Sequence, residues 1–167
     1  MRKRIQTDES LCSGCRYCEL ACSYTHYGKY NPRLSRIRIV KDDEIGMDVP
    51  VVCRQCRICI PAEECPVDAM IRDSNGAIII LEEKCIGCGE CISNCPFGSI
   101  SWSPYVDEPI VCDLCGGDPS CVKKCPTKAL SYADPGETAQ KRQIKQAYSQ
   151  YRQLLSEWGL EKIREDF

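Results

Sequence analysis

The sequence is poor in the large aromatic side chains that usually fill a hydrophobic core. Its 167 residues include only two phenylalanines and two tryptophans. Conventional core material is therefore thin, and small folds of this kind are often stabilised by bound metal instead. The length is compatible with one or two small domains.

Other absences argue against whole classes of function. The net charge is −2, which disfavours a nucleic-acid binder with a basic surface. No apolar run approaches the length of a membrane span. Met1–Arg4 is followed by the polar segment Ile5–Glu9 and not by an apolar signal segment, so we expect a cytoplasmic protein. No phosphate-binding loop and no nucleophile paired with a base is visible, so we do not expect an enzyme.

Cysteine is the residue that the sequence has in abundance. Its 16 cysteines form four quartets with none left over. The quartets are Cys12, Cys15, Cys18 and Cys22; Cys53, Cys56, Cys59 and Cys65; Cys85, Cys88, Cys91 and Cys95; and Cys112, Cys115, Cys121 and Cys125. The third quartet reads C-x2-C-x2-C-x3-C-P, the spacing with which bacterial ferredoxins hold [4Fe–4S] clusters.

An internal repeat supports iron–sulfur ligation by all four quartets. Three quartets end in Cys-Pro, at Pro66, Pro96 and Pro126, and the sequence after each proline continues alike. A disulfide scaffold would need an oxidising compartment. Zinc sites usually assemble from two cysteine pairs and not from triplets followed by Cys-Pro. A zinc-stabilised interaction protein is therefore the remote alternative.

Two further residues have competing interpretations. His26 is the only histidine. It could be a cluster ligand, a proton relay or a partner contact, but we expect a locally hydrogen-bonded ring because the thiols already suffice as ligands. For Trp102 we expect packing against a cluster domain and not a redox role.

Short strands are expected around the quartets. They are predicted at Ile5–Ser10, which includes a turn, at Arg36–Ile39, Met47–Val52, Met70–Arg72, Ala77–Ile80, Ser99–Trp102 and Ile110–Val111. Asn75-Gly76 lies between two apolar segments and predicts a tight hairpin turn there.

A helix is expected after the turn at Asp134-Pro135-Gly136. It would span Glu137–Ile163, with Gly159 breaking it near its end. Its apolar and aromatic residues fall on one stripe, formed by Ile144, Ala147, Tyr148, Tyr151, Leu154, Leu155 and Trp158. The stripe could pack on the chain's own cluster domains, dock a larger subunit or lie on a membrane surface.

These residues carry a family resemblance. From Thr7 to Ala133 the chain resembles four-cluster, 16-cysteine ferredoxin-type subunits of multi-subunit oxidoreductases. The segment His26-x-Gly28-x-x-Asn31-Pro32-x-x-Ser35-Arg36-Ile37 resembles small subunits paired with tungsten enzymes of the aldehyde oxidoreductase type, including class II benzoyl-CoA reductases of strict anaerobes. The chain is similar, less specifically, to iron–sulfur subunits of molybdopterin reductases, hydrogenases and carbon monoxide dehydrogenases.

The resemblance implies four [4Fe–4S] clusters, each held by a triplet and by the fourth cysteine of a partner quartet. The implied ligand sets are Cys12, Cys15, Cys18 and Cys125; Cys112, Cys115, Cys121 and Cys22; Cys53, Cys56, Cys59 and Cys95; and Cys85, Cys88, Cys91 and Cys65. Cys59 is the least regular of these, because relatives often place the third ligand near Pro61.

The implied fold class is α+β, with two nested ferredoxin-like units. Residues 1–50 with 103–135 would form an outer two-cluster unit, residues 51–102 an inner one, and residues 136–167 a helical tail. The function expected is that of a non-catalytic electron-transfer subunit between a tungsten- or molybdenum-pterin subunit and ferredoxin or a flavin or NAD module. The alternatives are the iron–sulfur subunit of a hydrogenase, carbon monoxide dehydrogenase or DMSO reductase-type complex, and a free polyferredoxin.

Overall fold

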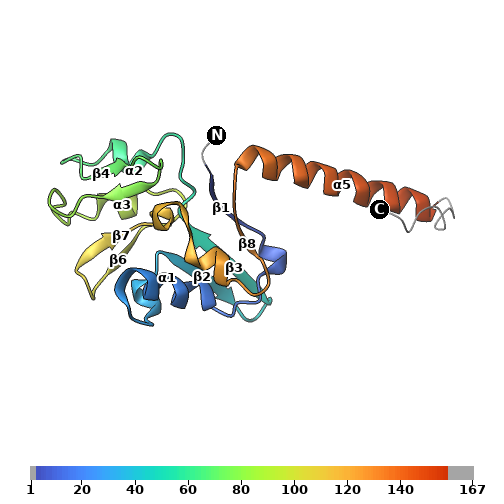
Figure 1. Ribbon diagram of the computed structural model, residues 1–167, viewed down its shortest axis with the longest axis horizontal. Coiled ribbons are helices and arrows are strands. Elements are labelled where there is room, and N and C mark those ends of the chain that lie inside the picture. Colours follow the sequence, from blue (N-terminus) through green and yellow to red (C-terminus); the bar gives the residue numbers. More distant parts are fainter. Residues whose placement is uncertain (1–2, 158–167) are drawn as a thin grey trace.

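The computed structural model describes residues 3–157, and it combines short helices with small antiparallel sheets (Figure 1). The eight strands are β1 (Arg4–Thr7), β2 (Ile37–Asp42), β3 (Met47–Val52), β4 (Met70–Arg72), β5 (Ile78–Ile80), β6 (Ser101–Ser103), β7 (Glu108–Ile110) and β8 (Leu130–Ala133). The helices are α1 (Tyr17–Tyr27), α2 (Ile60–Glu63), α3 (Glu90–Ser93), α4 (Ser120–Lys124) and α5 (Pro135–Glu157), with 3₁₀ turns η1 (Glu9–Leu11), η2 (Pro32–Leu34) and η3 (Leu114–Gly117).

The strands pair into four separate two-stranded antiparallel sheets, in the order β1–β8, β2–β3, β4–β5 and β6–β7. Three of these are hairpins between neighbours in sequence. The fourth joins the two ends of the cysteine-containing chain, with Ile5 opposite Tyr132 and Thr7 opposite Leu130. Helices α1 and α4, which carry cysteines from the first and fourth quartets, also contact each other. The first and last segments of the cysteine-containing part therefore lie side by side.

Most of the predicted elements are present. Strand β3 has the expected bounds, and β4 and β5 form the hairpin predicted from Asn75-Gly76. The backbone reason is visible at Gly76, whose φ of +82° is the left-handed conformation that a glycine adopts without strain. Strands β1 and β2 end three residues away from their expected ends, β5, β6 and β7 differ by one or two residues, and β8 was not among the predicted strands.

The interior is built from aliphatic side chains and cysteines. Ile5, Ile37, Ile78 and Leu114 are buried, together with six cysteines: Cys18, Cys22, Cys53, Cys112, Cys121 and Cys125. Among the described residues, none of the buried core side chains is aromatic. The thin core expected from composition is thus observed, with thiols occupying much of the interior.

Helix α5 extends away from the rest of the chain (Figure 1). Its Ile144, Tyr148, Tyr151 and Leu154 side chains are exposed, so this part of the predicted stripe does not pack on the cysteine-rich body. The Leu155 side chain and residues Trp158, Gly159 and Ile163 of the predicted helix lie outside the described residues. Within residues 3–157, no helix is both long enough and apolar enough to cross a lipid bilayer.

Candidate metal centres

Three cavities are each lined by four cysteines, and in every case three come from one quartet and one from another. We number these sets as sites. Site 1 contains Cys12, Cys15, Cys18 and Cys125; site 3 contains Cys53, Cys56, Cys59 and Cys95; and site 4 contains Cys65, Cys85, Cys88 and Cys91. These groups coincide with three of the implied ligand sets. Their role as ligands stays a prediction.

The remaining cysteines, Cys22, Cys112, Cys115 and Cys121, form site 2. Burial, followed by the neighbouring charges of Cys22, Cys115 and Cys18, raises the pKa of Cys121. Burial also raises the pKa of Cys112, with further contributions from Cys121, Cys22 and Cys53. Helices α1 and α4, which carry Cys18 and Cys121, contact each other, and Gln55 near Cys53 donates to the Cys112 carbonyl, so site 2 adjoins both site 1 and site 3.

The four quartets share one backbone feature. The second residue after the first cysteine of each quartet is left-handed: Gly14, Gln55, Gly87 and Leu114 have φ values of +63°, +50°, +68° and +60°. Only the glycines adopt this conformation without strain, so its recurrence at Gln55 and Leu114 marks a geometry that the loops require. A left-handed residue turns the chain sharply and lets the next cysteine face the same cavity as the first.

The three Cys-Pro turns share a second feature, which acts on the fourth cysteine of the second, third and fourth quartets. Asp68, Gly98 and Lys128, each three residues after that cysteine, are left-handed. The turn directs backbone N–H groups at the sulfur, as in the 3.3 Å bond that the Ala69 N–H donates to Cys65 Sγ. Burial raises the pKa of Cys65, but hydrogen bonds from the backbone of Val67, Ala69 and Met70 outweigh it and lower the pKa.

In several cysteines of the triplets the pKa is raised, not lowered. Burial, followed by nearby charges, raises the pKa of Cys18 to about 12, and burial with neighbouring thiolates raises the pKa of Cys53 and Cys91 to about 11. Thiolates gathered in a buried cavity repel one another, so a positively charged group among them is required to hold all of them ionised. Four soft thiolate donors around one small cavity are the donor set of a [4Fe–4S] cluster. The residues present therefore fit the expected cofactor.

The irregular spacing at Cys59 is accommodated by helix α2. Cys59 precedes the helix, and Cys59 and Pro61 both line the cavity of site 3. Burial raises the pKa of Cys59, as it does for Cys18 and Cys91. Cys59 thus occupies the position expected of a third ligand, and its sulfur is available to site 3.

A charged network beside site 2 was not predicted from the sequence. His26 Nε2 lies 3.0 Å from Asp113 Oδ1, and Arg36 Nη1 lies 2.5 Å from Asp113 Oδ2. Burial lowers the pKa of His26, but its hydrogen bonds to Asp113, Cys115 and Cys22 outweigh burial and raise it to about 12. The local hydrogen bond expected of His26 is present, from Nδ1 to the Cys22 carbonyl at 2.9 Å. The contact with Asp113, 87 residues away, could not be anticipated from the neighbouring sequence.

The nitrogen, carboxylate and sulfur atoms of His26, Asp113 and Cys115 lie within 4.8 Å of one another. Such a group could in principle hold a single metal ion. However, the His26 and Asp113 side chains are hydrogen-bonded directly to each other, and Cys115 belongs to site 2. The arrangement is better described as a hydrogen-bonded network bordering site 2.

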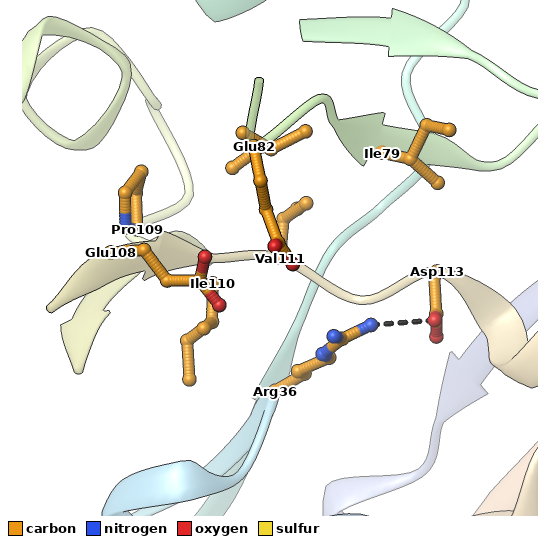
Figure 2. Close-up of a pocket in the computed structure, with 9 residues that line it drawn as sticks. Arg36, Ile79, Glu82, Glu108, Pro109, Ile110, Val111 and Asp113 are labelled. Atoms are coloured by element: carbon orange, nitrogen blue, oxygen red, sulfur yellow. Dashed lines mark hydrogen bonds and ion pairs between the residues drawn. The ribbon is translucent and has the colours of Figure 1, made fainter. Parts of the chain in front are cut away.

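Arg36 also borders a cavity of about 220 Å³ (Figure 2). Glu82 and Glu108 line the same cavity, and Figure 2 shows the Arg36–Asp113 ion pair along one side of it. Burial, then the charge of Glu82, raises the pKa of Glu108. No cysteine of sites 1 to 4 lines this cavity.

The sites follow one another in a row. Gln55 links sites 2 and 3: its Nε2 donates to the Cys112 carbonyl at 2.7 Å, and its Oε1 accepts from the Ile78 N–H at 2.8 Å. Helices α2 and α3, which adjoin Cys59 of site 3 and contain Cys91 of site 4, contact each other. Cys15 of site 1 and Cys88 of site 4 are exposed. The two end sites are therefore those with thiols at the surface.

Trp102 lies near site 4. A Cβ built on Gly87 would stand 3.4 Å from the Trp102 ring, which places the indole against the loop that carries Cys85 and Cys88. The ring is partly exposed. This position agrees with packing against a cysteine loop, as expected.

Comparison with known proteins identifies the family. The family model described as 4Fe-4S binding domain matches residues 78–101. A putative electron transport protein, YsaA of Escherichia coli (strain K12), is 37% identical over 158 residues, which cover 87% of this chain and 98% of YsaA. The polyferredoxin-like subunit of an aliphatic sulfonate oxidoreductase from Pyrococcus furiosus is 42% identical over 116 residues, or 68% of this chain and 66% of that protein.

A solved structure of the active site complex BamBC of benzoyl coenzyme A reductase, with 1,5-dienoyl-CoA, contains a chain 30% identical to this one. The match covers 78% of this chain and 75% of that chain, with a TM-score of 0.48. The family assignment rests on the sequence relatives and on the cysteine motifs. The chain belongs to the family of ferredoxin-type iron–sulfur proteins that serve in electron transport.

Proposed function

We propose that this chain is a non-catalytic electron-transfer subunit that holds four [4Fe–4S] clusters for a larger oxidoreductase. Such clusters exchange single electrons, at potentials set by charge, hydrogen bonding to sulfur and exposure. The observation that carries the proposal is the grouping of cysteines from different quartets around common cavities. A chain that needed only structural metal would not require four adjoining sites with exposed thiols at both ends of the row.

The ligand sets of this proposal are sites 1 to 4, and they imply two nested units. The outer unit comprises residues 1–50 and 103–135 and holds sites 1 and 2, while the inner unit comprises residues 51–102 and holds sites 3 and 4. The β1–β8 pairing and the contact between α1 and α4 support the outer unit. The Gln55 bridge supports close contact between the two units.

The non-catalytic role is supported by where the perturbed groups lie. Within residues 3–157, nearly every group with a resolved pKa shift is a cysteine of sites 1 to 4 or a member of the His26, Asp113 and Arg36 network. Glu108 is the exception, and its only strong charged neighbours are Glu82 and Arg36. This distribution supports sites that bind a redox cofactor and not a separate catalytic centre.

For the partner, we propose a tungsten- or molybdenum-pterin oxidoreductase, with ferredoxin or a flavin or NAD module as the other redox partner. The support is the resemblance of His26–Ile37 to subunits of that kind. That one relative is named as a subunit of an oxidoreductase also fits a larger partner. A hydrogenase, carbon monoxide dehydrogenase or DMSO reductase-type partner would use the same four sites equally well, because no described residue distinguishes one catalytic metal from another.

The test is to purify the native complex without oxygen and to measure its metals and partner together. Roughly sixteen iron and as many sulfide per chain are expected, with tungsten or molybdenum in a co-purifying larger subunit. Stoichiometric zinc without cluster absorption would refute the iron–sulfur assignment. Nickel, with hydrogen or carbon monoxide turnover, would replace the pterin partner by a hydrogenase or carbon monoxide dehydrogenase. Isolation of the iron-loaded chain without any partner would favour a free polyferredoxin.

A further inference from the structure

The first quartet departs from the repeat at its fourth cysteine. In the other three quartets a Cys-Pro turn supplies backbone N–H groups to that sulfur. Cys22 is followed by Ser23, and helix α1 continues past it to Tyr27. The N–H groups that follow Cys22 are therefore committed to the helix, and its sulfur needs other donors.

Those donors come from two places. The Arg36 backbone N–H donates to Cys22 Sγ at 3.3 Å, from the segment that enters β2. The additional helical turn carries His26, whose Nδ1 lies 3.9 Å from the same sulfur. Burial raises the pKa of Cys22, but its interactions with His26, Arg36 and Ser35 outweigh burial and lower it. The first quartet thus lacks the Cys-Pro turn, and His26 stands near the sulfur of its fourth cysteine instead.

The hydrogen-bond geometry of His26 also determines the charge of its ring. One ring nitrogen of His26 faces the Cys22 carbonyl and the other faces the Asp113 carboxylate, and both of these groups accept hydrogen bonds. The ring must therefore donate from both nitrogens, which makes it an imidazolium cation. Asp113 lies between this cation and Arg36, so two positive groups share one negative group beside site 2. Only 11% of the His26 side chain is exposed, so water screens its charge poorly.

Given the proposed ligation, on which this inference rests, the structure assigns a positioning role to the network. The Asp113 and Arg36 side chains hold His26 so that its charge and its N–H group raise the reduction potential of the cluster at site 2. A nearby positive charge and hydrogen bonds to sulfur both favour the reduced, more negative form of a cluster. Glu82 and Glu108 lie beyond Arg36, across the cavity, and offset part of the Arg36 charge (Figure 2).

The experiment is a redox titration of the anaerobically purified full chain, followed by EPR. His26→Gln removes the charge and keeps one hydrogen-bonding group. We expect one of the four midpoint potentials to move downward while iron content stays full. The shifted signal should be the one that Cys22→Ser alters.

Arg72→Gln is the matched control. The Arg72 guanidinium donates to the Cys56 carbonyl beside site 3, and its charge lowers the pKa of Cys59. Like His26→Gln, this variant removes one cation close to a cysteine site. That site is site 3 and not site 2. The variant should leave the signal assigned to Cys22 in place and shift a different one.

Unchanged potentials in an iron-replete His26→Gln protein would overturn the inference, as would an upward shift or an equal shift of all four. If His26→Gln lost the cluster, Arg36→Gln would decide, because it removes a charge and keeps the backbone N–H that reaches Cys22. An unchanged potential in that variant would refute the role. A wild-type chain that binds fewer than four clusters would instead refute the proposed ligation itself.

Discussion

A serine at position 23 stands where the other quartets have proline. Ser23 is fully buried, and its hydroxyl donates to the Leu20 carbonyl at 3.1 Å and accepts from the Asn31 N–H at 3.2 Å. The first bond keeps the residue within helix α1, and the second holds the turn that leads to Arg36. A proline here would remove a helical hydrogen bond at a cost of about 3 kcal/mol or more. The Ser23 side chain therefore helps to position both groups that approach the Cys22 sulfur, His26 and the Arg36 backbone N–H.

Exchange of Cys22 for serine tests the nested ligation. In Cys22→Ser we expect damage to the cluster held with Cys112, Cys115 and Cys121, with iron falling from about sixteen towards about twelve per chain. Cys115→Ser should alter the same EPR signal, although the two residues lie far apart in sequence. Cys12→Ser is the control and should alter another signal. If Cys22→Ser and Cys12→Ser affected the same signal, the pairing would be wrong.

The glycines Gly14 and Gly28 form a matched pair for testing the loop of site 1. Both have a φ of +63°, but a Cβ at Gly14 would overlap the Asp48 carboxylate, which pairs with Lys41 and would have to move, whereas nothing lies within 4 Å of one at Gly28. Gly28→Ala should cost only the strain of a left-handed alanine, about 1–2 kcal/mol. Gly14→Ala should cost more and should reduce iron binding at site 1, because Gly14 lies between Cys12 and Cys15. Thermal denaturation of the iron-loaded proteins, with iron analysis, makes the comparison. Equal losses in both variants would contradict it.

Helix α5 is little covered along its described length. Tyr148 and Tyr151 are each more than half exposed, at 57% and 56%, on a helix that extends from the body (Figure 1). Aromatic side chains are enriched at protein interfaces, where a rigid ring buries a large area. The exposed stripe therefore fits a helix that docks the larger subunit better than one that packs on its own chain.

Truncation after Gly136 tests this interpretation. Since the described stripe residues are exposed, the shortened protein should keep all four clusters, with iron content unchanged. Its affinity for the catalytic subunit should fall, by an amount that surface plasmon resonance or co-purification can measure. Tyr148→Ala with Tyr151→Ala, in the full-length chain, provides the milder variant. Loss of clusters on truncation would show that the helix stabilises the body instead.

The sequence predicted elements whose signals are local. The Asn75-Gly76 turn and the strand at Met47–Val52 were predicted from neighbouring residues, and both elements have the expected form. Helix α1 was not predicted from the sequence. The Asp113–His26 contact was also missed, since nothing in sequence links residues 87 positions apart. Two signals were available in retrospect: the absent proline after Cys22 and an aspartate directly after Cys112.

We expect the whole molecule to depend on bound clusters for its interior. With mostly aliphatic side chains and cysteines as its buried apolar residues, and sheets of only two strands, the chain has few contacts that could replace the clusters. A two-stranded sheet is at best marginally stable without further packing. The clusters are thus expected to act as the core of the fold.

Removal of iron should therefore unfold most of the protein. After chelation under reducing conditions, far-UV circular dichroism should lose most of its strand and short-helix signal, because site formation and folding are one equilibrium. Reconstitution with iron and sulfide should restore it. An apo chain that kept a native spectrum and a cooperative thermal transition would show that the polypeptide folds without its cofactors.

The pairing of β1 with β8 has a consequence for how the protein is made. A ribosome releases the chain from its N-terminus, so β1 emerges long before Leu130–Ala133 can join it. In the proposed ligation, all eight cysteines of sites 3 and 4 are released before Cys112, whereas Cys12, Cys15 and Cys18 must wait for Cys125. The inner unit can therefore acquire its clusters during synthesis, while the first triplet stays incomplete and open to oxidation. Delivery of iron and sulfide to the outer unit should be the last and most oxygen-sensitive step of maturation.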